Sequence, residues 1–195
     1  MTIPEDIYRD SGSRLPFPVR EELDDIGKKM FDQALDSGNK TAAGLRGPIG
    51  ILLHSSQVAR CHGELFRYLT FESGISSLIR ELAILVTARE MDSKYEWAAH
   101  EPFALKAGVT QEIVNIIKYR KSYSELPETE ASVIQLGREM FGKREVSSET
   151  FSQAIKIFGK KGLVDLVALM AHYCATAAIL CAFDKQVGPD EPQLP

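Results

Sequence analysis

The chain has 195 residues, of which 44% are apolar and 26% are charged, a composition typical of a soluble globular protein with a substantial core. The formal net charge is -4, so the chain lacks the bulk basicity that holds nucleic acid, and we expect no nucleic-acid partner. Three cysteines form no CxxC pair, which fits a reducing, cytoplasmic environment without a disulfide framework.

The first 20 residues predict an extended arm. Proline interrupts the segment at three positions, including Pro16 and Pro18, and a helix cannot continue through them. We expect this arm to lie on the surface of its own or a neighbouring subunit. The N-terminal residues are acidic and lack an apolar segment, so they do not resemble a secretory signal.

Apolar spacing predicts a first amphipathic helix from Arg20 to about Leu35, with Gly38 and Asn39 as its stop. The loop at 37–50 is rich in glycine, but no Gly-Lys-Ser/Thr follows it, so we expect a turn into the next helix rather than a phosphate site. Residues 51–70 predict one or two further helices.

The second half continues the helical pattern. A short helix is predicted after Thr110, with Thr110 as its N-cap, and residues 118–128 form a charged connector. Helices are predicted over 128–141 and 149–158, and Gly159 precedes a last long helix. The proline-rich tail at 188–195 is expected to be disordered. Strand signals are weak throughout, so the fold class predicted is all-α.

The apolar stretch at 163–183 is interrupted by Asp165, His172 and Thr176, and its many small residues favour a buried helix rather than a membrane span. Residues 163–169 also resemble 79–85 at an offset of 84, which suggests two degenerate helical repeats. We therefore divide the chain into an arm and helix (1–44), a helical core (45–120), and a second degenerate repeat with the tail (121–195).

Glu96 and His100 are the first candidates for chemistry. They lie four residues apart, on one face of a predicted helix, and an imidazole can gain or lose a proton near neutral pH. Two structural alternatives compete: His100 packs in the fold, and Glu96 forms a capping box with Ser93 at the helix start. The sequence favours the cap for Glu96. His54, His62 and His172 are isolated, and structural roles are expected for them.

Glu81 is a charged residue among apolar neighbours, and a buried carboxylate requires a partner. It either points to solvent beside Arg80 or faces a polar site. Two carboxylates and a histidine could resemble a metal set, but the chain has no HExxH motif and no second close histidine. We expect no metal site.

These residues belong to a longer pattern. The segments Arg-Glu-Leu-Ala-Ile-Leu at 80–85, Tyr-Glu-Trp-Ala-Ala-His at 95–100 and Ala-Gly-Val at 107–109 together resemble the carboxymuconolactone decarboxylase family, whose relatives include the alkylhydroperoxidase D proteins. Leu-Arg-Gly-Pro at 45–48 and Leu-Leu-His-Ser at 52–55 resemble the longer members. In the peroxidase branch the pattern is a glutamate, a CxxC and a histidine. In this sequence the glutamate falls on Glu81 and the histidine on His100, while the two cysteine positions are occupied by Ser93 and Glu96. Because serine and glutamate cannot form a disulfide, the resemblance disfavours thiol peroxidase activity.

The resemblance implies an alkylhydroperoxidase D-like helical fold and a homo-oligomer, whether dimer, trimer or hexamer. It implies a cofactor-free lyase that decarboxylates a small carboxylated lactone or related acid. His100 would transfer the proton, Glu96 would orient His100, and Glu81 would assist. The substrate would lie near Tyr95, Trp97, His54 and Ser93. No membrane partner is expected.

Three alternatives remain open from the sequence. The same fold could perform another cofactor-free proton transfer, such as isomerisation or hydrolysis. It could be a non-catalytic oligomeric binding protein in which Ser93 and Glu96 cap a helix. A residual peroxidase using Cys61 is the least favoured, because that cysteine has no motif partner.

Overall fold

The described residues of a computed structural model, 4–36 and 44–195, form helices joined by short turns and contain no β-strand, which confirms the predicted all-α class. In chain order the helices are η1 (3₁₀, Arg20–Glu22), α1 (Asp25–Leu35), η2 (3₁₀, Gly44–Arg46), α2 (Pro48–Leu52), α3 (Ser56–Arg67), η3 (π, Tyr68–Glu72), α4 (Ser77–Glu90), α5 (Lys94–Lys106), α6 (Gln111–Lys118), α7 (Glu128–Gly137), η4 (π, Arg138–Lys143) and α8 (Ser148–Ala182). The predicted stop at Gly38 and Asn39 lies outside the described residues.

Side-chain caps fix where several helices begin. The side chains of Ser76, Thr110 and Ser147 each accept a hydrogen bond from the backbone N–H three residues later. The predicted N-cap at Thr110 is therefore confirmed. Gly159 has a φ of 67°, which glycine adopts readily, and it kinks α8 where the sequence predicted a break between two helices.

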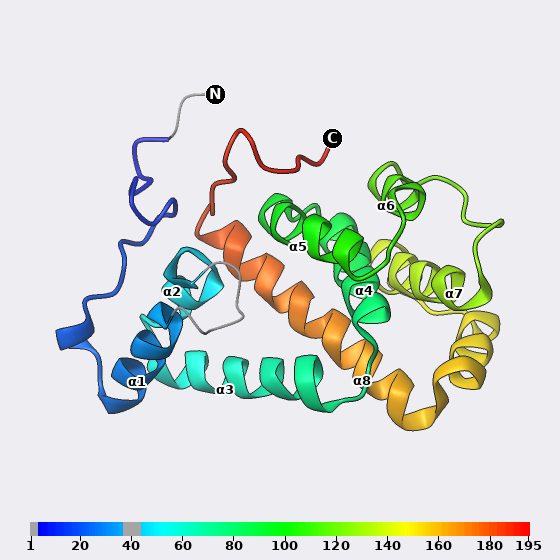
Figure 1. The fold of residues 1–195 in the computed structure, drawn as a ribbon, viewed down its shortest axis with the longest axis horizontal. Coiled ribbons are helices and arrows are strands. Elements are labelled where there is room, and N and C mark those ends of the chain that lie inside the picture. Colours follow the sequence, from blue (N-terminus) through cyan, green and yellow to red (C-terminus); the bar gives the residue numbers. More distant parts are fainter. Residues whose placement is uncertain (1–3, 37–43) are drawn as a thin grey trace.

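Helix α4 lies at the centre of the fold (Figure 1). All nine residues from position 81 to 89 are buried, so this helix has no solvent-facing side over that length. It packs mainly against α5, α7 and α8. Helix α7 approaches closely because Gly137 has no side chain: a Cβ there would lie 2.3 Å from Val86 Cγ1 and 2.7 Å from Met170 Cε. This packing holds α4 rigidly beside its neighbours.

Helix α8 runs across the molecule, with α3 on one side and α4 and α5 on the other (Figure 1). By length and composition alone it could cross a membrane, but 56% of its most apolar 18-residue window is buried inside the protein. A core helix of a soluble protein meets the same criteria, so this observation is weak support for a membrane span.

Two apolar clusters form the core. The larger one joins Leu69 to residues of α4–α8, and therefore includes residues on both sides of position 120. The smaller one is formed by Leu52, Leu53 and Ala59 with partly buried residues of α1. Among the described residues two π-helical turns precede helix starts 71 positions apart, one before Ser76 and the other before Ser147.

The N-terminal arm lies on its own subunit. The Arg14 N–H donates to the Phe183 carbonyl at 2.9 Å, and the Gln186 N–H donates to the Gly12 carbonyl at 2.8 Å. These bonds join the arm to the C-terminal end of α8. The tail also has a defined place, since Leu194 packs against the larger core cluster. The predicted disorder of the tail is thus corrected, because an apolar side chain near its end is partly buried.

Candidate functional site

Glu81 and His100 form the centre of the candidate site. Glu81 Oε2 lies 2.9 Å from His100 Nδ1, although the two residues are 19 positions apart. A carboxylate can only accept, so Nδ1 carries the proton and Nε2 is left for other partners. The Glu81 side chain is 10% exposed and that of His100 is 21% exposed. The pair is therefore sheltered, and the imidazole remains within reach of a ligand.

The turn between α4 and α5 brings this pair together. Only three residues, 91–93, separate the helices, and Asp92 adopts a positive φ of 48° within the turn. Two helices joined so tightly pack antiparallel, and residues at similar distances from the turn face each other. Glu81 lies ten positions before the turn and His100 lies seven positions after it, so each is two to three helical turns away from it.

Glu96 has neither of the roles predicted for it. Ser93 is the N-cap of α5, but its side chain makes no capping hydrogen bond, and its backbone N–H already donates to the Ala88 carbonyl at 2.8 Å. The capping box is therefore absent. Glu96 does not orient His100 either, because Glu81 occupies Nδ1 and both carboxyl oxygens of Glu96 lack a hydrogen-bond partner among the described residues.

Burial determines the protonation of Glu96, which is only 3% exposed. Loss of hydration raises the pKa of Glu96 from 4.5 to about 8. The nearby Ser93 hydroxyl lowers the pKa of Glu96 by a small part of this rise. The hydroxyl is not placed well enough to form a hydrogen bond, and neither carboxyl oxygen has a partner among the described residues. At neutral pH Glu96 is therefore mostly an uncharged acid with a proton to donate.

Tyr173 of α8 is a site residue that the sequence did not indicate. Its ring packs edge-on against His100, with centroids 5.1 Å apart, and the residue is 6% exposed. Burial raises the pKa of Tyr173, and the charges of Glu81 and Glu96 raise it further. Both carboxyl groups thus lie within electrostatic reach of a phenol that stays protonated. A lone tyrosine in an apolar helix carries no motif, so only the packing of α8 on α4 and α5 reveals it.

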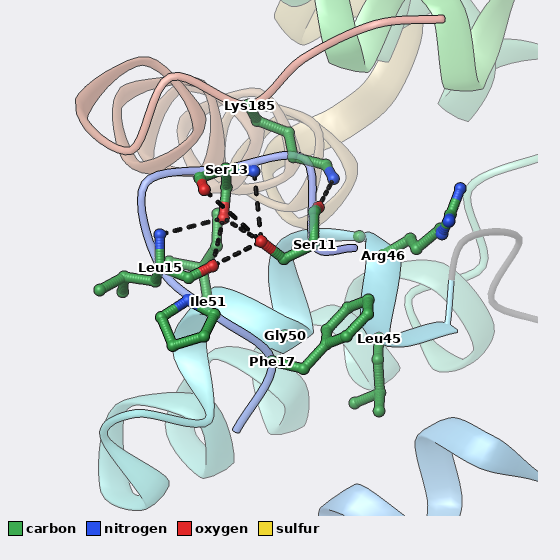
Figure 2. A pocket seen from close by; sticks show the side chains of 11 residues that line it. Ser11, Ser13, Leu15, Phe17, Leu45, Arg46, Gly50, Ile51 and Lys185 are labelled. Atoms are coloured by element: carbon green, nitrogen blue, oxygen red, sulfur yellow. Dashed lines mark hydrogen bonds between the residues drawn. The ribbon is translucent and has the colours of Figure 1, made fainter. Parts of the chain in front are cut away.

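Tyr95 and His54 lie elsewhere, at the N-terminal arm. The Tyr95 hydroxyl donates to the Arg46 carbonyl at 2.9 Å, and Lys185 Nζ lies 5.1 Å from the centre of its ring. His54 Nε2 lies 3.0 Å from the Pro16 carbonyl. Figure 2 shows this region, where the arm, α2 and Lys185 pack so closely that no cavity large enough for a water molecule lies between them. These contacts hold the arm, and the structure does not bring either residue to His100.

Trp97 is also directed away from the site. It is fully buried, its Nε1–H donates to Glu101, and Lys118 Nζ of α6 lies 5.7 Å from the ring centre. The aromatic side chains beside His100 are instead Tyr173 and Phe103, whose ring centroid is 6.2 Å from that of the imidazole. Of the predicted substrate-binding residues, only Ser93 remains near Glu96.

Cys174 is a thiol within electrostatic reach of Glu96. Burial raises the pKa of Cys174, and the charge of Glu96 raises it further, which disfavours the reactive thiolate. All three cysteines are free. Within residues 4–36 and 44–195, no group of three or more His, Cys, Asp or Glu side chains is arranged to hold a metal ion.

The residues brought together are thus Glu81, His100, Glu96 and Tyr173, from three helices. They combine an imidazole that is hydrogen-bonded to a carboxylate with two uncharged donors, which is a set suited to moving a proton and stabilising an oxygen anion. Comparison with protein-family models gives no match, and comparison with curated proteins gives none either.

Proposed function

We propose that the protein is a cofactor-independent lyase of the carboxymuconolactone decarboxylase type, with an alkylhydroperoxidase D-like fold, acting on a small carboxylated lactone or related acid. The observation that carries the proposal is the hydrogen bond between Glu81 and His100. These are the two positions on which the family resemblance places its glutamate and its histidine. A carboxylate on Nδ1 fixes the tautomer of the imidazole and leaves Nε2 to exchange a proton with the substrate.

The proposed reaction has two steps. The bond between the substrate carbon and its carboxylate breaks, CO₂ leaves, and the bonding electron pair passes into a conjugated carbonyl to give a dienolate. Protonated His100 then delivers the proton on Nε2 to the carbon that lost CO₂, and the electron pair returns from the oxygen. The imidazole regains a proton from solvent, so the net change is uptake of one proton and release of CO₂.

Glu96 and Tyr173 supply the uncharged part of the site. The negative oxygen of a dienolate is stabilised by hydrogen-bond donors that are already in place. A carboxylic acid kept neutral by burial and a protonated phenol are both such donors, whereas an ionised Glu96 would repel the intermediate. This assignment replaces the orienting role first expected of Glu96.

Two further expectations belong to the proposal. Relatives in this family lead us to expect a homo-oligomer, and the composition leads us to expect a cytoplasmic protein. Loss of CO₂ is favoured in an apolar environment, and Phe103 and Tyr173 provide apolar surface beside His100.

The proposal is tested by release of CO₂ from a panel of small carboxylated lactones. Wild-type protein should turn over at least one member, and His100→Gln and Glu81→Gln should each lower turnover by about 10² to 10⁴. Glu112→Gln, at an exposed position in the first turn of α6, is a matched control that should keep full turnover. Near-normal turnover by folded His100→Gln would contradict the proposal.

A further inference from the structure

Both oxygens of the Glu81 carboxylate are held. Oε2 bonds to His100, and Oε1 accepts a hydrogen bond from Arg80 Nε at 3.2 Å. Arg80 also donates through Nη1 to the Thr70 carbonyl at 3.1 Å. The Arg80 side chain is 19% exposed, so this bridge is sheltered from water. Arg80 therefore connects the carboxylate to the π-helical turn η3.

The turn η3 is itself fixed to α8. The Tyr68 hydroxyl donates to Asp165 Oδ1 at 3.2 Å, and Lys161 Nζ donates to Asp165 Oδ2 at 2.6 Å. Lys161 also donates to the Ser73 carbonyl, just past the end of η3, at 3.2 Å. The Thr70 carbonyl, which accepts the hydrogen bond from Arg80, thus lies in a segment that is anchored to α8 at both ends. A π-helical turn of this kind is often found next to functional sites.

We propose that Arg80 is the positioning residue of the site: it holds the Glu81 carboxylate against His100 Nδ1, so that Nε2 is the nitrogen presented to a ligand. The inference rests on the proposed function, and Arg80 acts through Glu81 without touching the substrate. Without Arg80, one oxygen of a buried carboxylate would have no partner, which favours a different rotamer of Glu81.

Charge balance gives Arg80 a second effect. A buried carboxylate needs a positive partner, and without Arg80 that partner would have to be the imidazolium form of His100. Because the guanidinium stays charged at all working pH values, it balances Glu81 whether or not His100 carries its second proton. The imidazole is then free to give up a proton and to take one back.

The test compares Arg80→Met, Arg80→Lys and Arg67→Met by ¹⁵N NMR of the histidine rings and by steady-state kinetics. Arg67 is a matched control, because its exposed side chain pairs with Glu72 at the end of η3. In wild-type protein at neutral pH, His100 Nδ1 should carry a proton that exchanges slowly with water. In Arg80→Met we expect that proton to exchange at least about tenfold faster, and turnover to fall about 10²-fold with little change in KM.

Arg80→Lys keeps the charge but cannot span both acceptors, so it should recover part of the slow exchange and part of the turnover. If Arg80→Met does not fold, Arg80→Lys takes its place as the variant that tests the inference. Arg67→Met should match wild type in both measurements. If Arg80→Met and Arg80→Lys both keep the Nδ1–H tautomer and its slow exchange, the inference is overturned. The NMR measurement needs no substrate, so absence of turnover in wild-type protein would refute the proposed reaction alone.

Discussion

Replacing Glu96 by glutamine removes an ionisation that the fold disfavours and changes few atoms. The pKa of Glu96 is about 8 in the folded protein against an ordinary value of 4.5. Between these values the folded state holds a proton that the unfolded chain releases. The stabilisation is therefore complete below pH 4.5 and is lost as the pH rises through 8.

The size of the effect follows from the shift, since one pKa unit corresponds to about 1.4 kcal/mol. Wild-type protein should lose up to about 3 kcal/mol of unfolding free energy between pH 4.5 and pH 7, and up to about 5 kcal/mol by pH 9. Glutamine is neutral throughout and loses none of this. Its amide is also left without partners in the same space, which costs about 1–3 kcal/mol. A net gain of about 2–4 kcal/mol at pH 9 is expected.

The assay is urea unfolding of wild type and Glu96→Gln at pH 5, 7 and 9. Groups distant from Glu96 titrate equally in both proteins, so the difference between the two proteins reports Glu96 together with its effect on Cys174 and Tyr173. That difference should grow in favour of glutamine as the pH rises, while the proposed turnover falls because the amide is a weaker donor. A difference that does not change with pH, or one that grows in favour of wild type, would refute the reasoning.

Three further substitutions test the packing and electrostatics. Glu139→Gln should lower stability by about 1–2 kcal/mol, because Glu139 Oε2 accepts from the Ser147 N–H at 2.9 Å. This hydrogen bond is the main reason why the pKa of Glu139 is lowered to about 2. In thermal melts the wild-type protein should therefore be more stable than Glu139→Gln above pH 4.5, and this difference in stability should disappear toward pH 2. His172→Gln should make the protein less sensitive to acid. Burial, together with the charge of His62, lowers the pKa of His172 to about 4, so the wild-type protein loses stability as the pH falls from 6.5 toward 4. Glutamine does not titrate, so the variant should lack this loss. Gly137→Ala should cost about 1–3 kcal/mol in chemical denaturation, because its Cβ would overlap Val86. Unchanged stability in the last variant would mean that α7 can move away from α4.

The all-α fold class could be predicted because its signals are local. Helical periodicity and the caps at Ser76 and Thr110 specify where helices begin. The family resemblance leads us to expect both Glu81 and His100 in the site, but the sequence pairs His100 with Glu96 and does not predict the bond between Glu81 and His100. The short turn between α4 and α5 brings the Glu81 and His100 side chains together, which spacing along the chain does not reveal.

Helix geometry explains why Tyr95 and Trp97 lie outside the site. Successive residues on a helix project about 100° apart, so the neighbours of Glu96 point away from the face that it shares with His100. Adjacent aromatic residues in a motif are therefore poor guides to a pocket. The structure instead places Tyr95 against Lys185 and Trp97 against Lys118.

The remaining site residues depend on tertiary contacts that sequence spacing does not encode. Tyr173 reaches His100 from a helix 73 positions further along the chain, and its neighbours have no polar pattern that marks it. The Ser93–Glu96 spacing matched a capping box, but the N–H that Glu96 would have accepted from is already bonded to Ala88. Only the packed structure shows that the Glu96 carboxyl group has no hydrogen-bond partner within residues 4–36 and 44–195.

The most direct test of the proposed proton transfer is decarboxylation of a substrate in D₂O. If His100 protonates the dienolate, wild-type protein should place one deuterium on the carbon that lost CO₂, on a single face. His100→Gln should give slow turnover with deuterium on both faces, because solvent would then protonate the intermediate. Deuterium on a single face at a normal rate in His100→Gln would contradict the account.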